Sequence, residues 1–255
     1  MARQRRHSTR RRRRGRFSGL YRLLSILAVA AAIAVACVVF FRINEVTVAG
    51  NSRYTAEEVI EASGIETGDN LVTLPKGRVA SQIRTRLPYV ESVSIQRLLP
   101  DGVLLTVKER VAAAVVDSDE GRWLISAQGK LLEQAGGQQL LTITGLKVLA
   151  PYAGGTMQVA EEDGNTLDYV LALLTELESR GMLADCTALD CTAAASMTLS
   201  YDIYQVKLPR RSDYSKLLAL LQGALADERM PQGVPGTFDL TVKEGEAYFL
   251  PQPSQ

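Results

Sequence analysis

Few residues of this sequence have the types and spacing that catalysis or metal binding requires. The 255 residues contain one histidine, His7, which lies within an arginine-rich segment. Zinc sites are usually built from Cys and His ligands at short spacing, and the three cysteines, Cys37, Cys186 and Cys191, form no such set. The sequence shows no nucleophile, zinc-protease or phosphate-loop motif. We therefore expect no enzyme activity, no metal and no cofactor.

Paired carboxylates are the one catalytic chemistry that the composition still allows, because two acids suffice for a glycosidase. Glu161, Glu162 and Asp163 are adjacent and precede Gly164 and Asn165, the predicted cap of a helix. Adjacent acids in such a place are more typical of a solvated loop.

An apolar stretch of nineteen residues, Leu23 to Phe41, contains Ser25 as its only polar residue. As a helix it would be roughly 28 Å long at about 1.5 Å per residue, close to the hydrocarbon thickness of a bilayer. A helix of a soluble core would show a polar face. A cleaved signal peptide is the alternative, but its apolar region would run to about 7–15 residues. We expect an uncleaved transmembrane helix over residues 23–41.

Charge divides the sequence into two unlike parts. Residues 1–22 hold ten arginines and no acid, including the run Arg10, Arg11, Arg12, Arg13 and Arg14. Residues 43–255 hold 18 basic residues against all 28 acidic residues, a formal net charge of −10. The positive-inside rule predicts that residues 1–22 stay in the cytoplasm and that the acidic part lies outside the membrane. A nucleic-acid-binding role of the arginines is kept as an alternative, though the acidic body would repel a polyanion.

The two outward cysteines leave the question of a disulfide open. Cys186 and Cys191 are five residues apart, which places them on opposite faces of a continuous strand. A bridge between them would need an intervening turn.

Residues 42–110 alternate between strand and helix patterns. Val46 and Val48 alternate with polar residues, which indicates a strand. Thr55 with Glu58 forms a capping box that starts a helix ending near Gly64, and a second helix ends at Pro88. A hairpin follows, turning at Pro100–Gly102. The predicted order is strand, helix, helix, strand, strand.

Residues 111–250 predict an α/β domain with a mostly antiparallel sheet and two packed helices. Strand-like segments surround two amphipathic helices, over residues 165–181 and 212–231. The last segment, 236–250, alternates like a strand and turns near Gly245. The whole chain is therefore predicted as α+β, with residues 251–255 as a short tail.

The element order of residues 42–110, with V-x-V-x-G-N at Val46–Asn51 directly after a single membrane span, resembles the POTRA domain of the FtsQ/DivIB family of bacterial cell-division proteins. The stretch RWLISAQGKLLE resembles that family's passage into its second domain, a hairpin of the type W-L-I-D-x-x-G. Ser126 stands where an acid is commoner.

The resemblance implies a non-enzymatic scaffold of the divisome. Such a protein binds coiled-coil partners of the FtsB/DivIC and FtsL types outside the membrane, at the septum, and indirectly controls the septal peptidoglycan synthase. A last strand at a sheet edge is also a template for another chain's strand. Together these expectations place partner binding on Leu240, Val242, Tyr248 and Phe249.

Other surfaces and functions remain as hypotheses. The resemblance makes the edge strand of the POTRA domain and the basic residues Arg84 and Arg86 candidates for recruiting further division proteins. The rival function is an envelope enzyme or substrate-binding protein that uses a POTRA-like module only for docking.

Overall fold

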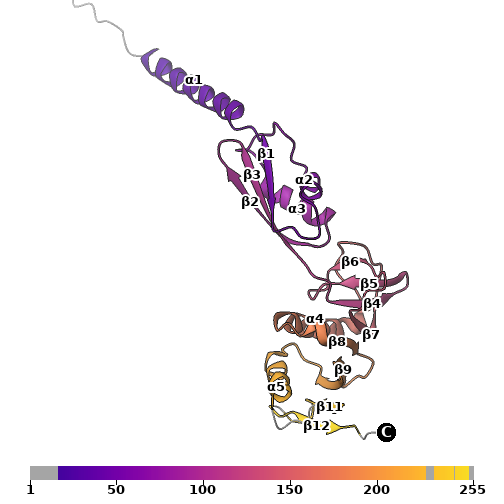
Figure 1. Ribbon diagram of the computed structural model, residues 1–255. Coiled ribbons are helices and arrows are strands. Elements are labelled where there is room, and N and C mark those ends of the chain that lie inside the picture. The colour runs from indigo at the N-terminus through magenta and orange to yellow at the C-terminus, as the bar shows by residue number, and fades with distance from the viewer. Residues whose placement is uncertain (1–16, 228–232, 244, 253–255) are drawn as a thin grey trace, which may run out of the picture.

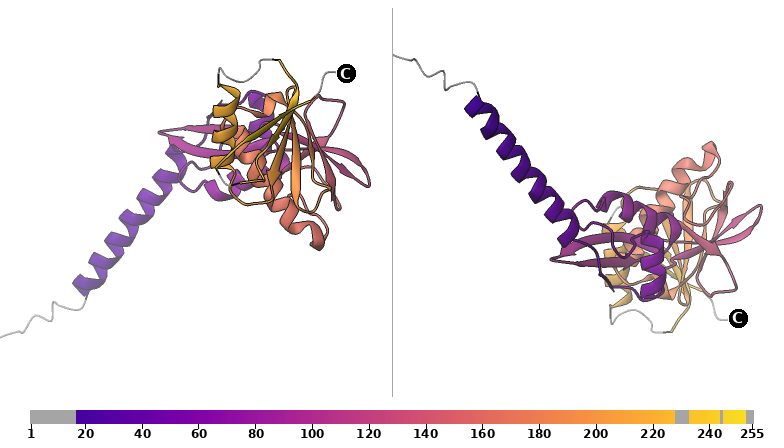
Figure 2. Two further views of the ribbon diagram at one scale, coloured as in Figure 1. Left: turned by 90° about the horizontal axis from the view of Figure 1, so that it is seen from below. Right: turned by 90° about the horizontal axis from the view of Figure 1, so that it is seen from above.

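The computed structural model describes residues 17–227, 233–243 and 245–252. The arginine run of residues 10–14, to which the sequence assigns the membrane orientation, lies outside these described residues. Helix α1 (Phe17–Phe40) opens the described chain and projects from the folded body (Figures 1 and 2). Among the described residues, α1 is the helix long and apolar enough to cross a membrane; its apolar stretch, Gly19–Cys37, has a mean hydropathy of 2.2 and none of it is buried.

The first unit comprises β1 (Glu45–Ala49), α2 (Ala56–Ser63), α3 (Lys76–Arg86), β2 (Val90–Leu98) and β3 (Gly102–Glu109). Its sheet has the order β1-β3-β2, with β1 parallel and β2 antiparallel to β3. The predicted order of elements is confirmed. Alternating side chains of the sheet and the inner faces of α2 and α3 form one apolar core, which includes Val59, Ile83 and Leu105.

Local chemistry explains the ends of the helices in the first unit. The predicted capping box is present: the Thr55 hydroxyl accepts from the Glu58 N–H, and the Glu58 carboxylate accepts from the Thr55 N–H. Gly64 ends α2 in the left-handed conformation, with φ of 65°. Helix α3 ends before Pro88, as predicted.

The second unit is built on a nine-stranded sheet in the order β12-β11-β10-β9-β8-β7-β4-β5-β6. The strands are β4 (Ala114–Ser118), β5 (Gly121–Ile125), β6 (Leu131–Gln134), β7 (Leu141–Val148), β8 (Cys186–Asp190), β9 (Ser196–Tyr201), β10 (Tyr204–Pro209), β11 (Gly236–Asp239) and β12 (Tyr248–Pro251). Neighbours are antiparallel except for β4–β7, β7–β8 and β10–β11, which are parallel. The α+β class and mostly antiparallel sheet are therefore confirmed.

Two helices, α4 (Gly164–Ser179) and α5 (Ser215–Leu225), pack on this sheet. Val170, Leu174 and Leu177 of α4 are fully buried, as their spacing predicts. The predicted cap at Asn165 is wrong. A 3-10 turn (Glu161–Asp163) runs directly into α4, so the helix begins at Gly164 without a side-chain cap. A second 3-10 turn (Leu183–Asp185) precedes β8.

Ser126 fixes the turn between β5 and β6. In the family that the sequence resembles, an acid is commoner at this position. The Ser126 side chain is fully buried, and its hydroxyl accepts from the N–H groups of Gln128 and Lys130. A hydroxyl can thus hold this turn without a negative charge.

The two units meet through a small cluster of their own. Tyr89, between α3 and β2, is 5 % exposed and packs against Val115, Leu124 and Leu132 of the second unit. Its hydroxyl donates to Glu133 at 2.8 Å, and Arg53 binds the same carboxylate at 2.9 Å. The units are thus joined by both apolar and polar contacts. In Figure 1 they follow α1 in line, and β12 lies at the opposite end of the molecule from α1.

Candidate partner-binding edge

Strand β12 is one edge of the nine-stranded sheet, as predicted for the last strand of the chain. It pairs antiparallel with β11, and Phe249 lies opposite Phe238. Within the described residues no further strand pairs with its outer side. An edge of this kind presents backbone N–H and C=O groups that can bind another strand.

The register shows which backbone groups of β12 face outward. The Gln252 N–H donates to the Pro235 carbonyl at 2.9 Å, so this pair is hydrogen-bonded. Because hydrogen-bonded and non-hydrogen-bonded pairs alternate in an antiparallel ladder, Leu250 and Tyr248 also bond to β11. The N–H and C=O of Phe249 therefore point outward. Pro251 offers only its C=O, because proline has no N–H.

The side chain of Phe249 faces the core and fixes the edge strand in place. Its ring lies 5.0 Å from that of Phe238 and 6.1 Å from that of Tyr204, measured between ring centroids. The ring also covers Gly236, where a Cβ atom would lie 2.5 Å from Phe249 Cε2. The strand is thus held by an aromatic cluster that needs a glycine beneath it.

The opposite face of β12 is exposed to solvent. Leu250 is 58 % exposed and Tyr248 is 40 % exposed. The Tyr248 hydroxyl donates to Glu246 at 2.7 Å, and Lys243 binds the same carboxyl group. Hydrogen bonds from Lys243 and Tyr248 lower the pKa of Glu246, and the bond to Glu246 raises the pKa of Tyr248. Charge-assisted bonds therefore hold Lys243 and Tyr248 to Glu246 although these groups are exposed.

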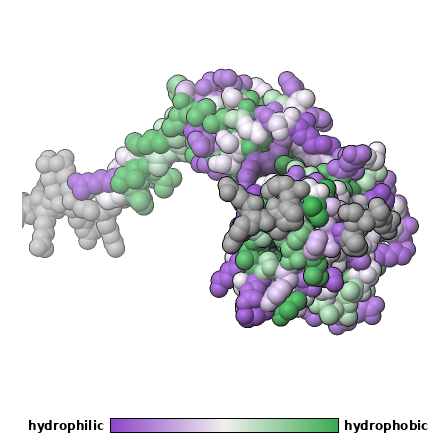
Figure 3. Space-filling view, turned by 60° about the horizontal axis from the view of Figure 1, so that its bottom comes forward, coloured by the Kyte–Doolittle hydropathy of each residue, from purple (hydrophilic) through white to green (hydrophobic). Residues whose placement is uncertain are grey.

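A groove of about 540 Å³ lies beside the edge, between α5 and the segment that leads into β12. One wall is the face of α5 from Ala219 to Ala224 together with Asp227 just after the helix, and the other is Gly245 to Tyr248. Gly223 lies in the helical wall, and nothing would contact a Cβ atom there within 4 Å. Figure 3 shows this end of the molecule, where apolar and polar side chains are mixed. The edge and the groove together can hold an extended segment and a side chain or helix next to it.

The structure separates the four residues predicted to bind a partner. Leu240 is 2 % exposed and belongs to the core, so its side chain is not available for direct contact. Val242 is 64 % exposed in the turn after β11, and Tyr248 is on the exposed face of β12. Phe249 offers its backbone rather than its side chain. Leu250, two residues after Tyr248 on the same face, was missed, although the period of two along a strand indicates it.

The structure brings no catalytic groups together at Glu161, Glu162 and Asp163. Glu161 and Glu162 are exposed, and the three residues form the turn before α4. Within the described ranges, no group of three or more His, Cys, Asp or Glu side chains is placed to hold a metal ion. Cys186 and Cys191 are buried free thiols, and burial raises the pKa of each to about 12.

Comparisons with known proteins agree with this architecture. The family model of the FtsQ-type POTRA domain matches residues 41–110, the first unit with its connection to α1. The cell division protein FtsQ of Syntrophotalea carbinolica is 25 % identical over 222 residues, 78 % of this chain and 76 % of that protein. The chain therefore contains a POTRA domain of the FtsQ type and is similar over most of its length to bacterial cell-division proteins of the FtsQ/DivIB kind.

Two further FtsQ/DivIB relatives match at higher identity over shorter segments. The FtsQ of an Anaeromyxobacter strain is 32 % identical over 57 % of this chain and 48 % of its own length. The DivIB of Clostridium acetobutylicum is 31 % identical over 42 % of this chain and 44 % of its own length. In these two alignments the chain spans about half the length of the relative. The family resemblance seen in the sequence is confirmed, and with it a role in cell division.

Proposed function

We propose that this protein is a non-enzymatic scaffold of the divisome that captures coiled-coil partners of the FtsB/DivIC and FtsL types at the β12 edge. Through them it helps to control septal peptidoglycan synthesis. The observation that carries the proposal is an ordered edge strand with outward backbone groups at Phe249 and a groove beside it. A partner strand added to β12 would extend the nine-stranded sheet.

Membrane anchoring makes weak contacts at this edge sufficient. Helix α1 has the length and hydropathy of a single span, and the arginine-rich segment before it in the sequence supports a cytoplasmic N-terminus by the positive-inside rule. The two folded units then lie outside the membrane, at the division septum. Partners anchored in the same membrane meet the edge at a raised effective concentration.

The boundaries proposed for the domains follow from the same arrangement. Residues 1–22 form the cytoplasmic tail, 23–41 the span, 42–110 the POTRA domain, 111–250 the second domain and 251–255 a short tail. Two separate apolar cores, one in each folded unit, support the boundary near residue 110.

The edge is tested by replacing its exposed side chains in the full-length protein, purified with a partner of the FtsB/DivIC type. Leu250→Glu and Tyr248→Glu place charges where the added strand must pack, so we expect partner affinity to fall by about tenfold or more. Gly223→Trp places a large side chain in the groove from a position where a Cβ atom meets no neighbour within 4 Å, and it is expected to act in the same direction. The measurement is retention of the partner at rising salt or by titration.

Val72→Glu is the matched control, because Val72 is also exposed, at 47 %, but lies in the first unit. The site assignment is wrong if partner binding survives the Leu250 and Tyr248 substitutions in a protein whose thermal midpoint is unchanged. The rival function, an envelope enzyme, would be supported by peptidoglycan hydrolysis that is lost when Glu161, Glu162 and Asp163 are all changed to the corresponding amides.

A further inference from the structure

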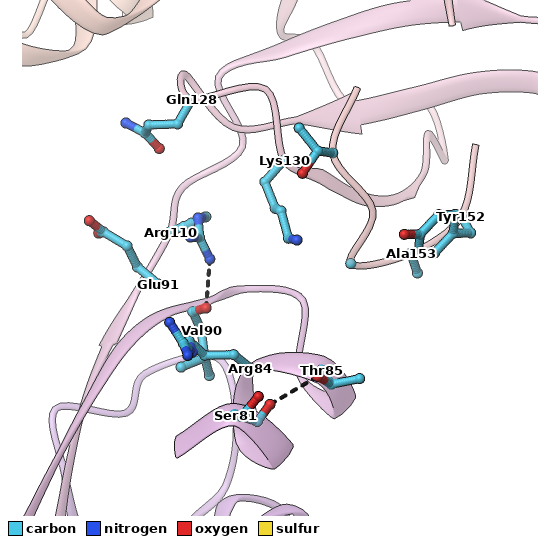
Figure 4. A pocket seen from close by; sticks show the side chains of 12 residues that line it. Ser81, Arg84, Thr85, Val90, Glu91, Arg110, Gln128, Lys130, Tyr152 and Ala153 are labelled. Carbon is cyan, nitrogen blue, oxygen red and sulfur yellow. Dashed lines mark hydrogen bonds between the residues drawn. The ribbon is translucent and has the colours of Figure 1, made fainter. Parts of the chain in front are cut away.

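A cleft of about 680 Å³ lies between the two units, on a surface that contains none of the β12 residues. Its walls come from α3 and the start of β2 in the first unit, from the connection after β3, and from the β5–β6 turn and residues 152–156 in the second unit. Figure 4 shows its lining side chains. We call it the cationic cleft, after Arg84, Arg110 and Lys130.

The three cations come from three different elements. Arg84 is on α3, Arg110 directly follows β3, and Lys130 ends the turn after β5. The Lys130 and Arg110 side chains reach into the space between the units (Figure 4). The backbone of Lys130 is fixed by the buried Ser126 hydroxyl, and Arg110 donates to the Val90 carbonyl at 2.6 Å. The backbone of Lys130 and the side chain of Arg110 are thus both held in place by hydrogen bonds.

No ion pair neutralises these charges within the described part of the chain, although the nearby Glu91 carboxylate favours the charged form of Arg110. Glu91 is the one acid that lines the cleft, and its carboxylate binds Lys108 at 2.9 Å. No ion pair joins Arg84, Arg110 or Lys130 to a carboxylate among the described residues, and Arg110 Nε is buried without a hydrogen-bond partner there. Burial and the charges of Arg110 and Arg84 lower the pKa of Lys130. Three positive charges that act on one another in one cleft favour the binding of an anion there.

We propose that the cationic cleft binds an acidic peptide segment of a partner protein, one that presents two or three carboxylates. Guanidinium groups bind carboxylates through paired, charge-assisted hydrogen bonds. Tyr152, which is 66 % exposed, gives the cleft an apolar portion that suits the side chains between those acids.

The charge of the rest of the protein favours a short acidic segment over a long polyanion. Residues 43–255 carry a formal net charge of −10, so a polyanion that extended beyond the cleft would meet a net repulsion from the rest of the folded part. The cleft is independent of the proposed β12 site, because the two share no residue.

Photo-crosslinking in the full-length protein can test the proposal. Thr156→p-benzoylphenylalanine places the reactive group in the cleft, so that peptide bound to the arginine-rich N-terminal segment is not recorded. The probe is a fluorescent peptide of alternating Glu and Leu, compared with the same peptide carrying Gln for Glu. We expect saturable crosslinking of the Glu peptide, weakened about tenfold by Arg84→Gln combined with Lys130→Gln.

Arg78→Gln is the matched control, because Arg78 is exposed on α3 but does not line the cleft. We expect it, and Leu250→Glu at the β12 edge, to change crosslinking by less than twofold. Equal crosslinking of the Gln peptide, or equal effects of the control and cleft variants, would overturn the proposal. Short-chain polyphosphate can be tested in the same protein. If polyphosphate binding depends on Arg84 and Lys130 while crosslinking of the Glu peptide does not, the peptide assignment is overturned in favour of a phosphate polymer.

Discussion

At the scale of single residues, two glycines near β12 have opposite roles. Gly236 lies beneath the Phe249 ring, whereas Gly223 faces open space on α5. We expect Gly236→Ala to destabilise the second unit by about 1–3 kcal/mol, because the added methyl group must displace the ring or the Leu250 carbonyl. Gly223→Ala should leave stability unchanged or raise it by up to about 1 kcal/mol, since alanine favours a helix.

The two variants can be compared in the full-length protein by thermal unfolding, followed through the fluorescence of Trp123, which is buried in the second unit. A Gly236 variant as stable as the parent would mean that Phe249 does not depend on that close contact. The start of β11 would then have no steric requirement for a glycine.

The chemistry of single residues also explains why the sequence pattern is wrong about the end of β11. Leu240 and Val242 alternate with polar residues, so the pattern predicts that the strand continues through them. The Asp239 carboxylate instead accepts from the Thr241 N–H at 2.9 Å and from its hydroxyl, forming a local turn that ends β11. Alternation indicates which residues share a face, but a side chain that bonds to its own backbone decides where the strand ends.

At the scale of elements, Glu109 ties the end of β3 to the loop between β1 and α2. Its carboxylate accepts from the N–H groups of Ser52, Arg53 and Tyr54 and from the Ser52 hydroxyl. Burial alone would raise the pKa of this carboxyl, but these bonds outweigh burial and hold it below its ordinary value.

We expect Glu109→Gln to cost about 1 kcal/mol of stability at neutral pH, a value reduced for partial exposure. A carboxyl whose pKa is lowered by folding adds stability above its unfolded pKa, about 4.3, and loses it as the pH falls through the folded pKa. The stability difference between parent and variant should therefore be constant above about pH 5 and shrink below about pH 4. Unfolding curves over this range measure it, and a difference that persists undiminished at pH 3 would contradict this account.

Elements with strong local signals were predictable, and those set by distant contacts were not. The capping box at Thr55 marks the start of α2 and the left-handed Gly64 marks its end, as predicted. Both signals act within four residues of the chain. Asn165 is a good cap by type, yet α4 begins at Gly164, where the chain continues from the preceding 3-10 turn. The parallel pairing of β10 with β11 brings together strands separated by α5, which no local pattern indicates.

At the scale of the whole molecule, Tyr89 is the residue that joins the two units. The sequence gives no sign of this role, because Tyr89 follows Pro88 in a short connection and its buried partners in the second unit, Val115, Leu124 and Leu132, lie 26 or more positions further along the chain. The Arg53 guanidinium lies 3.8 Å from the centre of its ring. The Arg53–Glu133 ion pair is about half exposed, so it adds at most about 1 kcal/mol, and the buried ring is the main link.

We expect Tyr89→Ala to loosen the joint between the units without unfolding either of them, because each keeps its own core. Spin labels on cysteines introduced at Glu57 and Lys216, in a Cys37→Ser background, would report a broader distance distribution. Tyr152→Ala removes an exposed tyrosine near the joint and serves as the control. An unchanged distribution in the Tyr89 variant would show that other contacts hold the units together.

The outward edge of β12 has a consequence for self-association. Pro251 lacks an N–H, so any ladder that includes it loses one hydrogen bond. Two copies of this chain that paired through β12 would bring two such prolines into one ladder, whereas a foreign strand meets only one. The same residue that shortens the binding edge therefore disfavours pairing of two copies of the protein through β12, while leaving the edge open to a different chain.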